Sequence, residues 1–241
     1  MNWKRAQGKI ISAWLVLTGK LYPSGSQAGE DQLIRYLFFS CLGITKPTYL
    51  DIGANHPFDC SNSFYFYSRG SSGVCMEPDP SFYSLLKKYR KRDIILQAGV
   101  GLENSDEAQL YVFPGMYASW NTFSTAEAEL RVRESGIIYR EVMKVPMIKI
   151  NTVLEKYFPE CPNLISIDVE GLDLQILESL DFDRFKPEVI CVESITFSTH
   201  NQETKVTEIG EFMRSKGYFV FGDTHINTVF CRQDAFNKIN E

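Results

Sequence analysis

The stretch that decides the fold is residues 48–53, TYLDIG, a short apolar run that ends at a glycine. Similar strand-like runs follow along the chain, and helical stretches separate them. These runs are VCME (74–77), DIILQAGV (93–100), LISIDV (164–169) and EVICVES (188–194). Strands that alternate with helices predict a mostly parallel sheet with helices on both faces, an α/β fold. The last two runs, YFVFGDT (218–224) and NTVFCRQ (227–233), leave no room for a crossover helix between them, which predicts an antiparallel edge.

The helices have recognisable starts. Ser26 precedes two acidic residues and an apolar pattern, which predicts a helix over 26–39 capped by that serine. Asp79 followed by Pro80 predicts the start of another helix. About 60 residues separate the third strand from LISIDV, and we expect an insertion over about 102–145 to act as a lid over the substrate.

The first 24 residues are predicted to form an extension outside a single domain that spans 25–241. The mostly apolar run Ile10–Leu17 is eight residues long, too short to cross a bilayer. Lysines flank it at Lys9 and Lys20, as in an amphipathic helix. Such a helix docks on the core, on a second subunit or on a membrane surface.

Composition excludes several classes of protein. The 241 residues carry a net charge of −5, so no general positive field attracts nucleic acid, and nucleic acid is not expected as a partner. Six cysteines show no CxxC spacing or zinc ribbon. Cys75 and Cys191 lie in apolar runs and are expected to be buried thiols. These features predict a cytoplasmic protein, peripheral to the membrane if residues 1–24 bind lipid.

The ends of the predicted strands carry acidic side chains. Ligands of open parallel sheets bind beyond the carboxyl ends of the strands, so these residues indicate function. The side chains at these ends belong to Asp51, Glu77, Asp168, Glu170 and Glu193.

The loop after the first strand does not fit a dinucleotide. That fingerprint requires glycines at 53, 55 and 58, and the chain has Gly53, Asn55 and Phe58. Glu77 stands 24 residues after Gly53, where a carboxylate accepts hydrogen bonds from a ribose. A cofactor that contains a ribose but no pyrophosphate suggests S-adenosyl-L-methionine. The alternatives are that Glu77 only faces solvent and that Asp51 only caps a turn.

Several segments together resemble the FkbM-type methyltransferases, a branch of the class I S-adenosylmethionine-dependent enzymes. They are SQAGED (26–31), YLDIGANHPFDCSNSFYFYSRG (49–70), GVCMEPDP (73–80), SIDVEGLDLQILESL (166–180) and VICVES (189–194). The resemblance implies a Rossmann-like sheet of seven strands with an antiparallel seventh strand. It also implies O-methylation of a hydroxyl, frequently on a sugar or a polyketide.

The resemblance also assigns residues. Matched position by position, Asp51, Gly53 and Asn55 form the cofactor loop, Glu77 is the ribose acid, and Asp168, Glu170 and Gly171 form the fourth-strand motif. Gln27 lies at the start of the helix predicted over 26–39. Residues at this position either only begin the helix or also contact the cofactor or acceptor, and we include Gln27 among the cofactor-binding candidates.

A hydroxyl becomes a good nucleophile only when its proton is removed. Asp168 and Glu193, at the ends of adjacent strands, are the candidate bases, with His225 as a third catalytic candidate and His56 and His200 behind it. The same two carboxylates are candidate ligands for Mg²⁺, which would lower the pKa of the hydroxyl.

The sequence thus predicts an O-methyltransferase that acts on a hydroxyl, of a carbohydrate or another small molecule. Two alternatives stay open. One is a non-catalytic module that binds the cofactor, or a partner, within a glycan-assembly complex, because a fold and a cofactor site do not guarantee turnover. The other is a methyltransferase for a small-molecule natural product.

Overall fold

The computed structural model describes residue 16, residues 22–200 and residues 202–238. Most of the predicted amphipathic extension, residues 1–24, therefore lies outside the described residues, as do its expected contacts with a subunit or a membrane. Within the described part of the chain, no helix has the length and apolar character needed to cross a membrane.

Seven strands form the central sheet. They are β1 (Tyr49–Ile52), β2 (Gly73–Met76), β3 (Ile94–Leu96), β7 (Leu164–Ile167), β8 (Val189–Glu193), β9 (Tyr218–Asp223) and β10 (Asn227–Arg232). Their order across the sheet is β3-β2-β1-β7-β8-β10-β9. Only β10 runs antiparallel to its neighbours, β8 and β9. The predicted seven-stranded, mostly parallel sheet is confirmed, and its antiparallel strand lies one position in from the edge.

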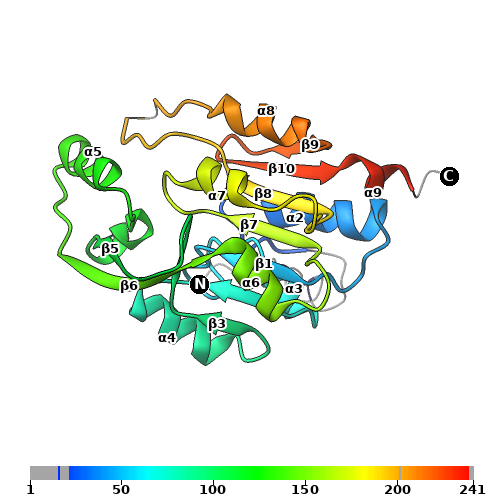
Figure 1. The fold of residues 1–241 in the computed structure, drawn as a ribbon, viewed down its shortest axis with the longest axis horizontal. Coiled ribbons are helices and arrows are strands. Elements are labelled where there is room, and N and C mark those ends of the chain that lie inside the picture. The colour runs from blue at the N-terminus through cyan, green and yellow to red at the C-terminus, as the bar shows by residue number, and fades with distance from the viewer. Residues whose placement is uncertain (1–15, 17–21, 201, 239–241) are drawn as a thin grey trace, which may run out of the picture.

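Helices cover both faces of this sheet, as Figure 1 shows. They are α2 (Glu30–Tyr36), α3 (Phe64–Ser68), α4 (Pro80–Tyr89), α6 (Ile150–Tyr157), α7 (Asp173–Ser179), α8 (Thr207–Ser215) and α9 (Gln233–Asn237). A further helix, α5 (Thr125–Ser135), contributes to neither of the two apolar cores of this sheet. A π-helical turn, η1 (Leu37–Cys41), continues α2, and a 3₁₀ turn, η2 (Gly115–Trp120), precedes α5. Residues of α6, α7 and α8 form one apolar core with the sheet, and residues of α2, α3, α4 and α9 form a second core on the other face.

The predicted strand over 93–100 is divided between two sheets. Its second half is β4 (Gly99–Gly101), which pairs with β6 (Glu141–Lys149), and β6 pairs on its other side with β5 (Ser105–Val112). A Cβ at Gly99 would lie 2.5 Å from the ring of Phe123 and 2.6 Å from the sulfur of Met147. A side chain at residue 99 would therefore require the Phe123 ring and the end of the Met147 side chain to move. Figure 1 shows β5, β6 and α5 together at one end of the large sheet.

The first described helix begins later than predicted. Gly29, with φ of 96°, takes the N-cap position of α2, and Ser26 lies three residues before it. The Ser26 hydroxyl nevertheless accepts a hydrogen bond from the N–H of Asp31 in the first turn at 3.2 Å. The carboxylate of Asp31 instead accepts hydrogen bonds from the backbone N–H of Gly25 at 2.7 Å and from the Ser26 hydroxyl at 3.1 Å. These bonds keep residues 24–29 as a loop. The other predicted start is confirmed, since Asp79 caps α4 and accepts from the N–H of Ser81 at 2.7 Å.

A buried ion pair supports the face of the sheet that α3 and α4 cover. The side chains of Arg90 and Asp93 are 1% and 0% exposed, and Arg90 Nε lies 2.8 Å from Asp93 Oδ2. The Tyr49 hydroxyl donates to Asp93 Oδ1 at 2.7 Å, and Arg90 also donates to the Ser63 hydroxyl at 2.9 Å. This network joins β1 to α3 and to the end of α4.

We expect Asp93→Ala to lower the free energy of unfolding by about 3 to 5 kcal/mol, because it leaves the Arg90 guanidinium buried without its carboxylate. Urea unfolding followed by circular dichroism measures the loss. Asp183→Ala, at an exposed aspartate, is the matched control and is expected to change stability by about 0.5 kcal/mol or less. A loss below about 1 kcal/mol in Asp93→Ala would show that the pair contributes no more than a surface salt bridge.

Candidate functional site

A cavity of about 860 Å³ opens at the carboxyl ends of the central strands. Its walls come from the loops after β1, β2, β7 and β8 and from residues 115–131 of the segment between β5 and β6. The strand order reverses between β1 and β7, and the crevice at such a switch point is where open α/β sheets bind ligands. The predicted position of the site therefore coincides with the cavity.

The backbone at the end of β1 meets the backbone at the end of β7. Gly53 has φ of 77°, and a Cβ there would lie 1.8 Å from the carbonyl oxygen of Asp168. The N–H of Asp168 donates to the carbonyl of Ile52 at 3.1 Å. Gly53 is required for this close approach, which brings the Asp168 side chain to the cofactor loop.

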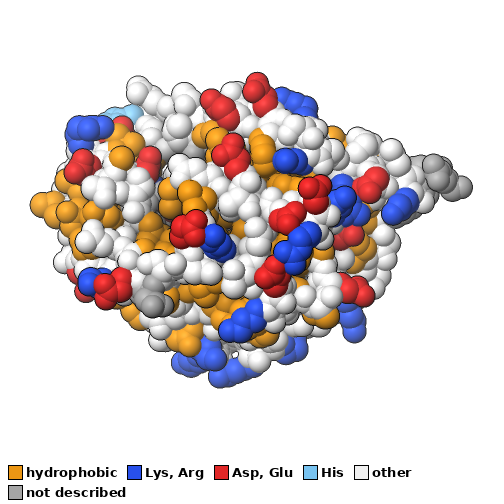
Figure 2. Space-filling model, viewed as in Figure 1, with side chains coloured by type: hydrophobic (Ala, Val, Ile, Leu, Met, Phe, Trp, Pro, Cys, Tyr) orange, Lys and Arg blue, Asp and Glu red, His pale blue; other side chains and the backbone are white. Residues whose placement is uncertain are grey.

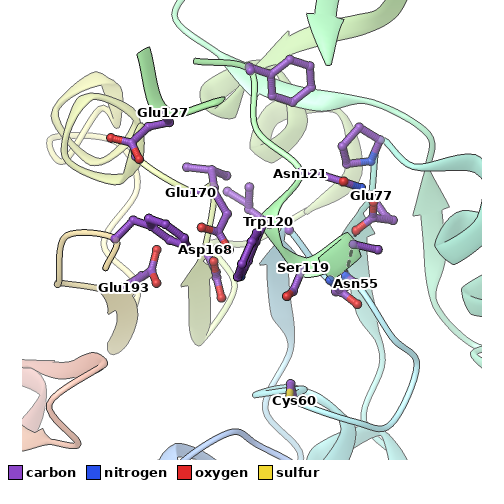
Figure 3. Close-up of a pocket in the computed structure, with 18 of the residues that line it drawn as sticks. Asn55, Cys60, Glu77, Ser119, Trp120, Asn121, Glu127, Asp168, Glu170 and Glu193 are labelled. Carbon is purple, nitrogen blue, oxygen red and sulfur yellow. Dashed lines mark hydrogen bonds between the residues drawn. The ribbon is translucent and has the colours of Figure 1, made fainter. Parts of the chain in front are cut away.

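Glu77 holds the cofactor loop and the start of α4 together. One carboxylate oxygen accepts from the N–H of Asn55 at 2.8 Å, and the other accepts from the N–H of Asp79 at 2.7 Å (Figure 3). Burial raises the pKa of Glu77 to about 8, although both hydrogen bonds favour the charged form. Each oxygen of a carboxylate accepts two hydrogen bonds, so Glu77 retains capacity for ligand hydroxyls in the cavity that it lines.

Two carboxylates at the end of the sheet have no partner. Asp168 and Glu193 follow the paired residues Ile167 and Val192 on adjacent strands, and both line the cavity (Figure 3). Their side chains accept no hydrogen bond and form no ion pair with any residue that the structure describes. Burial, together with the negative charge of Glu170, raises the pKa of both well above the usual range. Both carboxylates are therefore available to a ligand in the cavity.

Arg131 of α5 is the main residue of the site that the sequence did not reveal. Its side chain is 1% exposed and lies 2.7 Å from a carboxylate oxygen of Glu170. It also donates to the backbone carbonyl of Trp120 and lies over the ring of Phe197, 4.8 Å from the centroid. In the sequence it resembles its exposed neighbour Arg133, and only its spacing of four residues from Glu127 suggested a partner.

Gln27 lines the cavity, as predicted for a cofactor-binding residue. Its neighbours Glu30 and Asp31 are buried and hold the loop that carries it. Glu30 accepts from the N–H of Ala28 at 2.9 Å and from the Thr224 hydroxyl at 2.7 Å. These two acids therefore position Gln27 and do not themselves line the cavity.

Asp51 lies outside the cavity, which corrects the predicted contact with the cofactor. Side chains alternate along β1, so Leu50 and Ile52 pack against the α6–α8 face while Asp51 points to the other face. There its carboxylate is buried and accepts a hydrogen bond from the Ser63 hydroxyl. Burial raises its pKa. Its role in this structure is to join β1 to α3.

Two of the three histidines also lie away from the cavity. His225 is exposed in the turn between β9 and β10 and does not line the cavity, so the structure does not bring this catalytic candidate to Asp168 and Glu193. His200 is likewise exposed. His56 lines the cavity, and its Nδ1 accepts from the N–H of Asp59 at 3.2 Å.

The residues present do not make the predicted Mg²⁺ site. No group of three or more His, Cys, Asp or Glu side chains suited to a metal occurs among the described residues. Asp168 and Glu193 supply two carboxylates, so the other oxygen ligands of an octahedral Mg²⁺ would have to come from water or substrate. No step of the chemistry below is assigned to a metal.

Comparison with known proteins gives a family match. The sequence model described as "Methyltransferase FkbM domain" matches residues 51–220. No protein of curated function matches the chain.

Similar solved structures include precorrin-6y C5,15-methyltransferase from Geobacter metallireducens, with 15% identity and a TM-score of 0.43 over 87% of this chain and 93% of that one. A putative O-methyltransferase from Klebsiella pneumoniae has 10% identity and a TM-score of 0.43 over 88% and 83%. The third is 1,6-didemethyltoxoflavin-N1-methyltransferase from Burkholderia thailandensis, solved with S-adenosylhomocysteine, with 11% identity and a TM-score of 0.37 over 85% and 77%. Assignment of the family depends on the sequence match, since these structural scores are low.

We expect Arg131→Met to raise the pKa of Glu170 from about 7 to about 8 or higher, because the nearest opposite charge is lost. A pH titration of the ¹³C-labelled carboxyl groups by NMR measures the change. Arg133→Met, on the exposed side of the same helix, is the control and is expected to leave Glu170 unchanged. An equal or lower Glu170 pKa in Arg131→Met would contradict the assigned ion pair.

Proposed function

Because the chain belongs to the FkbM methyltransferase family, whose members depend on S-adenosylmethionine, we propose that it transfers the methyl group to a hydroxyl of a carbohydrate. The observation that carries this proposal is the unpartnered pair Asp168 and Glu193, which faces the cavity opposite the Glu77 loop. A hydroxyl acceptor needs a base at that position, and a carboxylate is a suitable one.

One half of the cavity suits the cofactor. Gly53 and Asn55 leave the loop backbone open to a ligand, Glu77 is placed to accept from ribose hydroxyls, and Gln27 faces the same space from its loop. Asp168 is near enough to the loop to accept from the amino group of the cofactor as well. When bound, S-adenosylmethionine supplies a methyl group on a positively charged sulfur, and negative side chains favour this charge.

The other half suits the acceptor and its proton. One of the two carboxylates, Asp168 or Glu193, accepts the hydroxyl proton while the new O–C bond forms and the C–S bond breaks. Their raised pKa values favour this role near neutral pH, since the best base has a pKa close to the working pH. After burial and Glu170, the negative charge of Asp168 also raises the pKa of Glu193, so the two carboxylates titrate as interacting groups.

The insertion between β4 and β6 is proposed as the lid. Asn121 donates to the Asp79 carboxylate at 3.0 Å, and the Thr122 hydroxyl donates to the carbonyl of Glu170 at 2.9 Å. With the Arg131–Glu170 ion pair, these contacts attach residues 102–145 to the loop after β2 and to the loop after β7. A lid in this place excludes water from the reacting groups.

We expect Asp168→Asn to lower turnover by about 100-fold or more, because the amide cannot accept the hydroxyl proton. Transfer of a labelled methyl group to a panel of sugars and glycan fragments measures turnover, and calorimetry with S-adenosylhomocysteine checks that the cofactor still binds. Asp183→Asn, at an exposed aspartate, is the control.

Full activity of Asp168→Asn would exclude this residue from the chemistry. Loss of activity after chelation, restored by added Mg²⁺, would instead assign the two carboxylates to a metal. Cofactor binding without transfer to any acceptor would favour a non-catalytic module, and transfer only to compounds other than carbohydrates would contradict the proposed acceptor class.

A further inference from the structure

The lining of the cavity is strongly one-sided in charge. Seven acidic side chains line it, among them Glu127, Glu193 and Glu203, and Arg131 is the only lysine or arginine among the described lining residues. The outer surface differs, since Figure 2 shows Lys and Arg side chains interspersed with Asp and Glu on the face in view. The excess of negative charge is therefore a property of the site and is not simply the net charge of the chain.

The side chain of Arg131 already contacts other groups of the protein. Arg131 forms an ion pair with Glu170, donates to the carbonyl of Trp120 and lies over the ring of Phe197. Glu127 lies 3.6 Å from the same guanidinium. Only the buried Nε of Arg131 has no hydrogen-bond partner among the described residues, and no second lysine or arginine lines the described cavity to receive a phosphate or carboxylate of the acceptor.

The unpartnered carboxylates select for hydrogen-bond donors. Ionised Asp168 and Glu193 only accept hydrogen bonds, and hydroxyl and ammonium groups donate them. An anionic group would bring further acceptors and another negative charge beside two carboxylates whose pKa values are already raised by burial and by the negative charge of Glu170. Like charges brought together in this way are a common means of rejecting the wrong ligand.

Aromatic rings form an apolar part of the wall near these carboxylates. Trp120 and Phe197 line the cavity with ring centroids 5.1 Å apart and planes at 81°. Figure 3 shows Trp120 beside Asp168 and Glu170. A sugar ring of the acceptor matches such a wall. Its apolar C–H faces pack on the aromatic side chains, and the hydroxyl groups at its edge donate hydrogen bonds to the carboxylates.

We propose that the acceptor is a polyhydroxyl compound without negative charge, neutral or carrying an amine, and that phosphorylated, uronic and nucleotide-linked sugars are rejected. This inference rests on the proposed function and narrows its substrate class. The side chains that carry it are Asp168, Glu193 and Glu203, with Arg131 held by Glu170.

The test compares matched forms of one sugar core as acceptors. Glucose, glucosamine, glucose 6-phosphate, glucuronate and UDP-glucose are each incubated with the full chain and labelled S-adenosylmethionine, and the same set is repeated for other hexoses. We expect kcat/KM for the phosphate, uronate and nucleotide forms to be at least tenfold lower than for the neutral or amino form of the same core. Equal or faster transfer to an anionic form would overturn the inference.

A charge reversal in the cavity adds a directional test. Glu203→Lys is expected to raise the ratio of anionic to neutral acceptor kcat/KM by threefold or more, and the effect is expected to weaken at high salt. Glu208→Lys reverses the charge of an exposed residue on α8 and is expected to leave the ratio unchanged. Equal shifts in the two variants would mean that the general field of the protein, and not the cavity, sets the preference.

A binding measurement separates this inference from the proposed function. If no sugar is methylated, the carbohydrate proposal fails, and the protein loaded with S-adenosylhomocysteine is then titrated with glucosamine and with glucose 6-phosphate by calorimetry. Binding of glucosamine alone, or at least tenfold tighter binding of glucosamine, supports the charge selection. Any smaller difference, or tighter binding of the phosphate, contradicts it.

Discussion

The site depends on one close backbone contact, between Gly53 at the end of β1 and Asp168 at the end of β7. A side chain at residue 53 would overlap the carbonyl oxygen of Asp168, so the two strand ends can meet only at a glycine. The contact lies at the point where the strand order reverses. It sets the cofactor loop, held by Glu77, beside the carboxylate proposed to act on the acceptor. Binding and chemistry therefore share one rigid edge of the sheet.

The two faces of the sheet divide the acidic residues by role. Asp51 points to the face covered by α3 and α4, where the hydroxyl of Ser63 donates to its carboxylate and the positive charge of Arg90 favours its ionised form. Glu77, Asp168 and Glu193 lie at the carboxyl ends of their strands, where they line the cavity. The raised pKa values on the acceptor side reflect burial and repulsion among carboxylates that a donor-rich ligand would relieve.

Much of this arrangement was predictable from the sequence because apolar runs and strand-end residues follow regular rules. The parallel strands, the capping of α4 by Asp79 and the burial of Cys75 and Cys191 are confirmed. The face of the sheet to which the Asp51 side chain points depends on strand register, which a sequence motif does not give. The split after β3 depends on Phe123 and Met147 packing at Gly99, and Arg131 depends on tertiary contacts of α5. Long-range contacts of this kind leave no local pattern.

The central claim is that the loop held by Glu77 binds the cofactor, and calorimetry with S-adenosylhomocysteine tests it most directly. Glu77→Ala is expected to weaken binding by about 10- to 100-fold, because a charge-assisted contact contributes roughly 1.5 to 3 kcal/mol. Glu77→Gln, which retains one acceptor oxygen, is expected to lose less affinity for S-adenosylhomocysteine. Glu178→Ala, at an exposed glutamate, is expected to leave the affinity unchanged. Unchanged affinity in a folded Glu77→Ala protein would contradict the account.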